Sequence, residues 1–142
     1  MSTENEAVVR RFFEEFCNGR RLDIVDEIIH PDWELHEPHD PPASGREGAI
    51  ATVRLYQDSV DGHWEIQEML SAGDKVVTRW VGTGVHNAEL MGIPPTGREI
   101  RVDAITIHRI QDGMIIEHTG VWDALALLQQ LGVVEAPAAA AT

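Results

Sequence analysis

The pattern of apolar and polar positions divides the chain into a helical first part and a strand-rich second part. Apolar residues of the segment 4–18 recur every three or four positions, the spacing of a helix that buries one face. The same spacing predicts a shorter helix over residues 22–29, ended by His30 and the proline after it, and a third helix over residues 46–60. We therefore expect three helices before most of the strands.

Segments with alternating or β-branched residues predict the strands. A short strand is expected around residues 33–37, where Trp33, Leu35 and Glu37 alternate with Glu34 and His36. Further strands are expected over residues 64–70, 75–86, 101–110 and 114–121. In residues 101–110 alternation separates two faces, with Val102, Ala104, Thr106 and His108 on one and Arg101, Asp103, Ile105, Ile107 and Arg109 on the other.

Turn and cap residues complete the predicted order of elements. Asp112-Gly113 indicates a tight hairpin, Asp123 suits the N-cap of a helix over residues 124–131, and Gly132 suits its end. Helices and strands that are segregated along the chain are typical of the α+β class. We expect a cone-shaped, curved antiparallel sheet wrapped around three N-terminal helices, with a short C-terminal helix. Residues 1–134 form one domain in this interpretation, and residues 135–142 a disordered low-complexity tail.

Composition and charge narrow the possible functions. The chain has 142 residues, 43% of them hydrophobic, which is enough for one domain with a buried core. Its formal net charge of -13 argues against nucleic acid and anionic membranes as partners, since both need a basic surface. The sequence has neither an apolar run long enough to span a membrane nor a signal-peptide pattern, so a soluble cytoplasmic protein is expected.

Motifs for cofactors and metals are absent from the sequence. Cys17 is the one cysteine, which excludes an internal disulfide and a cysteine-based metal cluster. We find no glycine-rich nucleotide loop, no serine nucleophile elbow and no zinc signature. His36, Glu37 and His39 are conceivable metal ligands, but their spacing matches no ordinary helical or strand pair. We therefore expect no cofactor and no metal.

Several short motifs in a fixed order resemble a known family. They are His30-Pro31-Asp32, Gly45-Arg46-Glu47-Gly48, the run from Ala72 to Val77, Gly82-Thr83-Gly84 with His86, the run from Met91 to Gly97, Arg109-Ile110 with Asp112-Gly113, Ile116-Glu117-His118, Asp123, and Gln130-Leu131-Gly132. Together they are similar to the SnoaL-like polyketide cyclase family, within the nuclear transport factor 2-like or ketosteroid isomerase-like superfamily. The likeness covers nearly the whole chain up to its tail.

The resemblance implies a cone-shaped α+β barrel with a deep apolar pocket, a homodimer and cofactor-free acid–base chemistry. The characterised cyclases close a ring of an aromatic polyketide by intramolecular aldol condensation. In that family a catalytic aspartate lies two residues after the histidine that matches His118, and a partner histidine lies on the neighbouring strand. The matching positions are Gly120 and Thr106 in this sequence. Hydroxylases and epoxide-opening relatives share the scaffold.

The candidate catalytic residues are those that the strand pattern directs into the pocket. Proton abstraction beside a carbonyl group needs a base with a pKa near the working pH and a donor for the developing oxyanion. His118 and His108 share the predicted inward face, where they could act as base and donor, or could be core histidines bonded to the backbone. Asp123 could orient His118, or could only cap the last helix.

Aromatic and histidine side chains are the candidates for substrate binding. They are Trp33, His36, Trp80, His86 and Trp122, together with Thr106 and Gly120 on the face of the histidine pair. The tryptophans could equally be plain core residues, and His36 a solvated loop residue.

Our hypothesis from the sequence is a cofactor-independent enzyme of secondary metabolism. It would bind a largely apolar, polycyclic or polyketide-like ketone and catalyse ring closure or a related proton transfer. The alternatives are a hydroxylase-like or epoxide-opening enzyme and a member that binds a small molecule without catalysis. Ile105 and Ile107 face away from the pocket, so we expect a homodimer through the outer face of the sheet.

Overall fold

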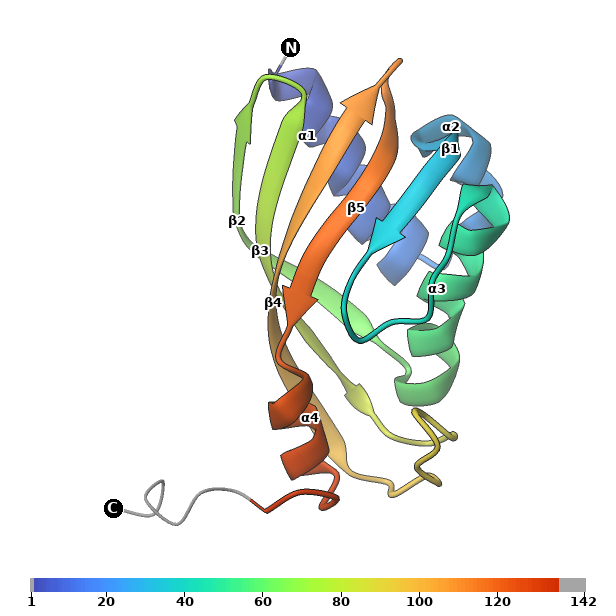
Figure 1. Ribbon diagram of the computed structural model, residues 1–142, viewed down its shortest axis with the longest axis vertical. Helices are drawn as coiled ribbons and strands as arrows, with labels where there is room; N and C mark the ends of the chain where they lie inside the picture. Colours follow the sequence, from blue (N-terminus) through green and yellow to red (C-terminus); the bar gives the residue numbers. More distant parts are fainter. Residues whose placement is uncertain (1, 136–142) are drawn as a thin grey trace.

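The structure is a computed structural model that describes residues 2–135. Its elements are α1 (Ser2–Arg11), the π-helix η1 (Phe12–Asn18), the 3-10 helix η2 (Leu22–Ile24), α2 (Val25–Ile28), β1 (Ile29–His36), α3 (Gly45–Val60), β2 (His63–Ala72), β3 (Lys75–Val85), β4 (Glu99–Gln111), β5 (Met114–Trp122) and α4 (Ala124–Gln130) (Figure 1). The α+β class is confirmed. The predicted tail lies outside the described residues, apart from residue 135, and the single domain over residues 1–134 stays a prediction.

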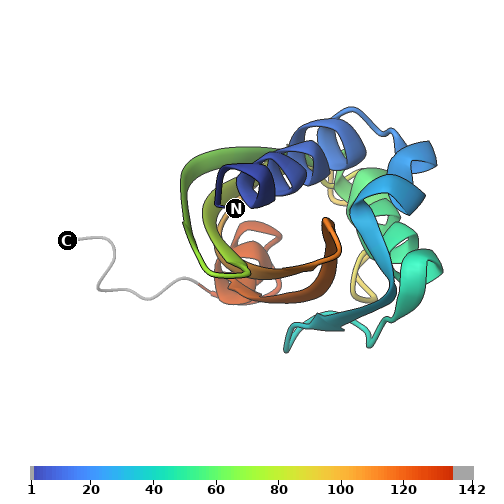
Figure 2. The ribbon, with the colours of Figure 1, turned by 90° about the horizontal axis from the view of Figure 1, so that it is seen from above.

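The five strands of the described chain form one curved, unclosed sheet in the order β1-β5-β4-β3-β2. Figure 2 shows the strands curving around one side of the molecule, while α1 and α3 close the other side. The pairs within β2 to β5 are antiparallel, but β1 runs parallel to β5, so the sheet is mixed rather than purely antiparallel. A parallel pair needs a long crossover, and the chain between β1 and β5 provides one that contains α3.

The first predicted helix changes its winding halfway along. It is an α-helix up to Arg11 and then a π-helix, with a hydrogen bond of 2.9 Å from the Gly19 amide to the Glu14 carbonyl beyond its end. The wider turn of a π-helix bonds residues five apart. It allows neighbouring pairs of side chains to face the core together, and all four are buried: Phe12, Phe13, Phe16 and Cys17.

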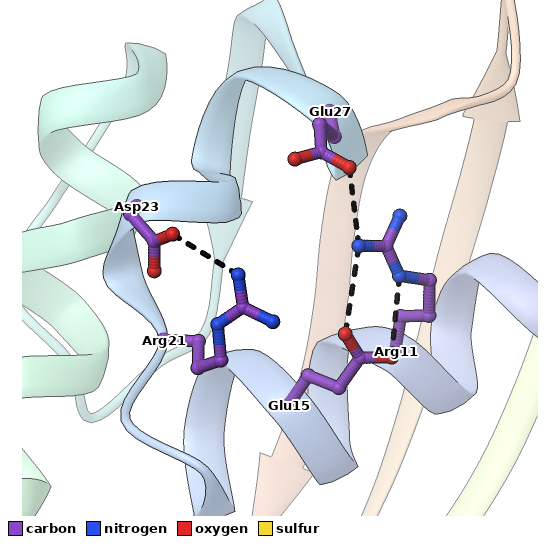
Figure 3. Close-up of polar contacts among 5 residues, drawn as sticks. All are labelled: Arg11, Glu15, Arg21, Asp23 and Glu27. Carbon is purple, nitrogen blue, oxygen red and sulfur yellow. Dashed lines mark hydrogen bonds and ion pairs between the residues drawn. The ribbon is translucent and has the colours of Figure 1, made fainter.

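The second predicted helix is shorter than expected, because β1 already begins at Ile29, which is paired with Ile115. An exposed ion pair between Arg11 and Glu27 links this region to the first helix (Figure 3). Arg11 lies 3.3 Å from Glu15 and 3.2 Å from Glu27. Pairs as exposed as these contribute at most about 1 kcal/mol to stability.

The predicted strand faces hold along β4, whose residues alternate between exposed and buried from Glu99 to Gln111. The hairpin to β5 also forms as expected, with positive φ at Asp112 and Gly113. A register shift beside this turn interrupts the alternation predicted for β5, so that Ile115 and Ile116 are both buried. The inner faces of the strands and the buried sides of the helices make one apolar core.

None of the helices in residues 2–135 is long and apolar enough to cross a membrane.

Candidate active site

A cavity opens between the inner face of the sheet, η1 and α3. The empty volume of the cavity is about 840 Å³, a figure that includes the open solvent at its mouth. Its wall is mainly apolar, with side chains that include Phe12, Phe13, Trp33, Val53, Trp64, Trp80, Leu90, Ile100, Val102, Trp122 and Leu127. Glu37, Asp40, Tyr56 and His118 bring polar atoms to this wall, and among the described residues neither lysine nor arginine lines it.

The two predicted histidines lie on paired positions of β4 and β5 with their rings inside the molecule. His108 Nε2 is 2.9 Å from His118 Nδ1, and His118 Nε2 is 2.8 Å from Oε1 of Glu37. Phe12 packs edge-on against both imidazoles. Only His118 lines the cavity, because His108 lies behind it.

The hydrogen bonds fix the protons of this pair. An ionised Glu37 only accepts, so His118 Nε2 must donate to it; when His118 carries this one proton, its Nδ1 accepts from His108 Nε2. Burial, followed by the charge that a protonated His118 would carry, lowers the pKa of His108 well below its ordinary value, which keeps His108 neutral. Its Nδ1 has no hydrogen-bond partner among the described residues.

Glu37 and Asp40 form a pair of carboxyl groups with different pKa values. Burial raises the pKa of Glu37, but hydrogen bonds from His118 and Asp40 outweigh it and leave the pKa below its ordinary value. Burial, and then the hydrogen bond and charge of Glu37, raise the pKa of Asp40 to about 7. Two carboxyl groups with separated pKa values are typical of sites that hold and move a proton.

Tyr56 projects from α3 and donates its hydroxyl to Oδ1 of Asp40. Burial, followed by the charge of Asp40, raises the pKa of Tyr56 well above its ordinary value, so the hydroxyl stays a neutral donor. The ring also packs against Trp122, with centroids 6.1 Å apart. Asp40 therefore meets an apolar wall on one side and a fixed donor on the other.

Both acids lie on the loop of residues 37–44 between β1 and α3. The loop is closed at its base by a hydrogen bond of 3.1 Å from the Leu35 amide to the Ala43 carbonyl and by a bridge between Glu34 and Ser44. Three of its eight residues are prolines. Proline restricts the backbone, so the loop holds the two acids in place before any ligand binds.

The predicted tryptophans line the cavity, but the other predicted contacts do not. Trp80 Nε1 donates to Thr106 Oγ1 at 2.9 Å, which places Thr106 behind the indole ring. Trp33 Nε1 is buried without an acceptor among the described residues, and thus remains a donor in the wall. Gly120 lies behind Glu37, whose Oε1 is 3.1 Å from the position that a Cβ on Gly120 would take.

Three further candidate site residues lie outside the cavity lining. Asp123 caps α4, with its side chain 3.0 Å from the Ala126 amide, and the carboxylate that holds His118 is Glu37. The side chain of His36 is 46% exposed beside Glu34 on the outer face, because alternation along β1 turns Leu35 inward.

His86 is the third of these residues. It is fully buried, and its Nδ1 is 3.0 Å from Thr96 Oγ1 and 3.2 Å from the Thr96 amide. It therefore anchors the connection between β3 and β4 rather than lining the cavity.

Asp40 and Tyr56 were not predicted as functional residues from the sequence, and Glu37 was a candidate only as a metal ligand. Tyr56 falls within the helix predicted over residues 46–60, and Asp40 lies in the segment between that helix and the strand predicted around residues 33–37. The signal was present in Glu37, which shares the inward phase of Trp33 and Leu35. Within residues 2–135, no group of three or more histidine, cysteine, aspartate or glutamate residues could hold a metal ion.

Comparison with known proteins decides the family. The model of the SnoaL-like polyketide cyclases matches residues 7–131.

The chain belongs to the SnoaL-like polyketide cyclase family.

Named relatives and a solved structure agree with this membership. The SnoaL-like chain is 34% identical over 138 residues to the aklanonic acid methyl ester cyclase DnrD of Streptomyces peucetius, covering 93% of this chain and 92% of DnrD. It is 32% identical over 120 residues to the nogalonic acid methyl ester cyclase of Streptomyces nogalater, covering 81% and 88% of the two chains. The structure of TsrD from Streptomyces laurentii superimposes with a TM-score of 0.82 at 28% identity, over 93% of this chain and 97% of TsrD.

Proposed function

We propose that this SnoaL-like protein is a polyketide cyclase that closes a ring by an intramolecular aldol-type reaction, using its own acid–base side chains. The observation that carries the proposal is Asp40, a carboxyl group on the wall of an apolar cavity with its pKa raised to about 7. A base works best when its pKa is near the working pH, because both protonation states are then accessible. The named relatives are cyclases of polyketide methyl esters, which supports the same reaction class.

In the proposed step, the Asp40 carboxylate removes a proton from the carbon beside a carbonyl group. The electron pair of that C–H bond forms the enolate, whose carbon attacks a second carbonyl carbon of the same molecule. The resulting alkoxide takes the proton back from Asp40, so that no atom or electron is gained or lost. Tyr56 donates to Asp40 before the transfer and is then free to donate to the oxyanion.

His118 supports this chemistry without being the base. One ring nitrogen accepts from His108 and the other donates to Glu37, so neither is free to take a proton from the substrate. We therefore assign the proton transfer to Asp40 and give His118 and His108 the role of holding Glu37. The sequence hypothesis had His118 as the base or as an orienting residue, and this proposal gives the role of base to Asp40.

The reaction can be tested with the substrate classes that the relatives' names state. Purified protein is incubated with aklanonic or nogalonic acid methyl ester without added cofactor, and the products are separated by chromatography. Aldol closure is an isomerisation, so we expect a new compound with the mass of the substrate and one more ring by NMR. Binding of both esters without any conversion would contradict the cyclase proposal and favour a ligand-binding role.

The carboxylate pair also supports a second candidate, the activation of water. Glu37 is kept ionised by His118 and shares the cavity with Asp40, as water attack on an epoxide would need. The two reactions differ in mass balance. An epoxide substrate would gain the mass of one water molecule, whereas cyclisation leaves the mass unchanged.

The substrate that fits this cavity is neutral. Glu37 and Asp40 line it, and the described residues place no lysine or arginine there to compensate an added negative charge. Like charges brought together in a desolvated site are strongly unfavourable. We expect a polyketide methyl ester to bind at least about tenfold more tightly than its free acid, a difference of about 1.4 kcal/mol. Quenching of tryptophan fluorescence measures both dissociation constants, and equal affinities would contradict the neutral-substrate proposal.

We also propose that the protein is a homodimer formed through the outer face of β4 and β5. Ile105, Ile107 and Val121 are 48%, 39% and 59% exposed there and form an apolar patch. Sedimentation velocity should show a dimer for the natural chain and a monomer for Ile107→Lys. The matched control is Leu125→Lys at an exposed apolar position on α4, which should remain dimeric. A natural chain that sediments as a monomer would contradict the proposal.

A further inference from the structure

Gly120 lies near the C-terminal end of β5, opposite Thr106 of β4, in a place without room for a side chain. A Cβ at this residue would lie 2.9 Å from the Ile105 carbonyl, 3.0 Å from Thr106 Oγ1 and 3.1 Å from Glu37 Oε1. Its φ is not among the positive values of the chain, so the backbone does not require glycine here. The reason for glycine at this position is therefore space.

One of the groups that occupy this space belongs to a different element. Glu37 follows β1, and its side chain crosses to β5, where its exposed fraction is 6%. Its Oε1 meets His118 Nε2 at 2.8 Å, two residues before Gly120 on the same strand. The carboxylate thus lies against the strand at the place from which a side chain of residue 120 would project.

We propose that Glu37 and Gly120 form one functional unit, in which the carboxylate of Glu37 replaces a side chain on residue 120 and acts as the positioning residue for Asp40. Gly120 makes room for the carboxylate, His118 holds it, and its negative charge faces Asp40. This inference rests on the proposed function, because it says how the ionisation of the base is set.

Burial is the largest cause of the raised pKa of Asp40, and Glu37 adds to it by a hydrogen bond that favours the protonated form of Asp40 and by the repulsion between two carboxylates. Glu37 stays ionised because His118 donates to it, so the proton is left on Asp40. The titratable groups around the pair are His39 on the same loop, Tyr56 from α3, and His118 from β5 backed by His108. We therefore expect the effect of a substitution at Gly120 to depend on whether Glu37 is present.

The first test follows the titration of Asp40 in the whole protein. Aspartate is labelled with 13C at its side-chain carboxyl, and the Asp40 signal is identified by its loss in Asp40→Asn. Glu37→Gln keeps an acceptor for His118 but removes the charge, so the midpoint of Asp40 should move from about 7 toward its ordinary value of 3.8. Glu34→Gln removes an exposed charge from neighbouring β1 and should leave the midpoint unchanged. An unchanged midpoint in Glu37→Gln would overturn the proposal.

The second test measures the coupling between the two positions by thermal unfolding. Gly120→Ala is made in the natural chain and in Glu37→Ala, and the loss in Tm is compared. The loss should be smaller in Glu37→Ala, because one of the three close contacts is then gone, while the contact with the Ile105 carbonyl remains in both. Equal losses in Tm would show that the two positions are independent and would overturn the proposal that Glu37 and Gly120 form one functional unit. Neither test uses a substrate, so its failure is distinct from a failure to find cyclase activity.

Discussion

Asp40→Asn is expected to lower kcat for ring closure by about 100- to 10,000-fold, the range that a positioned acid–base group contributes. Asparagine has nearly the same size and still accepts the hydroxyl of Tyr56, but it cannot take up a proton from carbon. The measurement is the rate of product formation at saturating ester for both proteins. Affinity for the ester should change much less than kcat, because the apolar wall of the cavity is untouched.

The matched control is Asp58→Asn, which makes the same chemical change at an exposed position of α3. It should turn over like the natural chain. Natural turnover by Asp40→Asn would remove Asp40 from the reaction and direct attention back to His118. A fall in kcat that appears equally in both variants would point to a general effect of charge.

Asp40 is also expected to make the protein less stable as the pH rises through 7. Its pKa is about 7 in the folded chain and 3.8 ordinarily, so between these values the folded state carries a proton that the unfolded state has lost. This contribution is fully present below the ordinary pKa and is lost as the pH rises through the folded pKa. Between pH 5 and pH 8 the loss is on the order of 2–3 kcal/mol for a carboxyl shifted this far.

The comparison with Asp40→Asn isolates this effect from other groups. The lowered pKa of His108 acts in the opposite direction, because stability from a buried neutral histidine is lost as the pH falls through its ordinary value. The lowered pKa of Glu37 stabilises above its ordinary value, and that stability is lost only at more acidic pH. Urea unfolding at several pH values should show the natural chain losing stability relative to Asp40→Asn as the pH rises. A constant difference between the two proteins would contradict the raised pKa.

Much of the architecture could be predicted from the sequence, because periodicity reports which face of an element is buried. The alternation along β4, the turn at Asp112-Gly113 and the cap by Asp123 were all predicted and are all present. The parallel pairing of β1 with β5 was not, because the direction of a pair between distant segments depends on the path of the chain. The π-helical winding of η1 was also missed, since its apolar residues fit an α-helical pattern almost as well.

The candidate site was predicted only in part, for a related reason. His118 and the tryptophans belong to elements with regular patterns, and the structure places them on the cavity wall. Asp40 lies in an irregular loop, where no period indicates which way a side chain points. Its pKa depends first on burial, and then on Glu37 three residues away and on Tyr56 from another element, and this environment exists only in the folded chain. His36 shows the opposite error, because the alternation along β1 already assigned it to the outer face.

The raised pKa of Asp40 is the property on which the proposed chemistry depends. The most direct measurement is the 13C titration of its side-chain carboxyl in the natural chain, without substrate. The midpoint is expected at about 7, which would make Asp40 a proton acceptor at neutral pH inside an apolar cavity. A midpoint at the ordinary value of 3.8 would contradict the account, because the carboxylate would then be too weak a base for the proposed step.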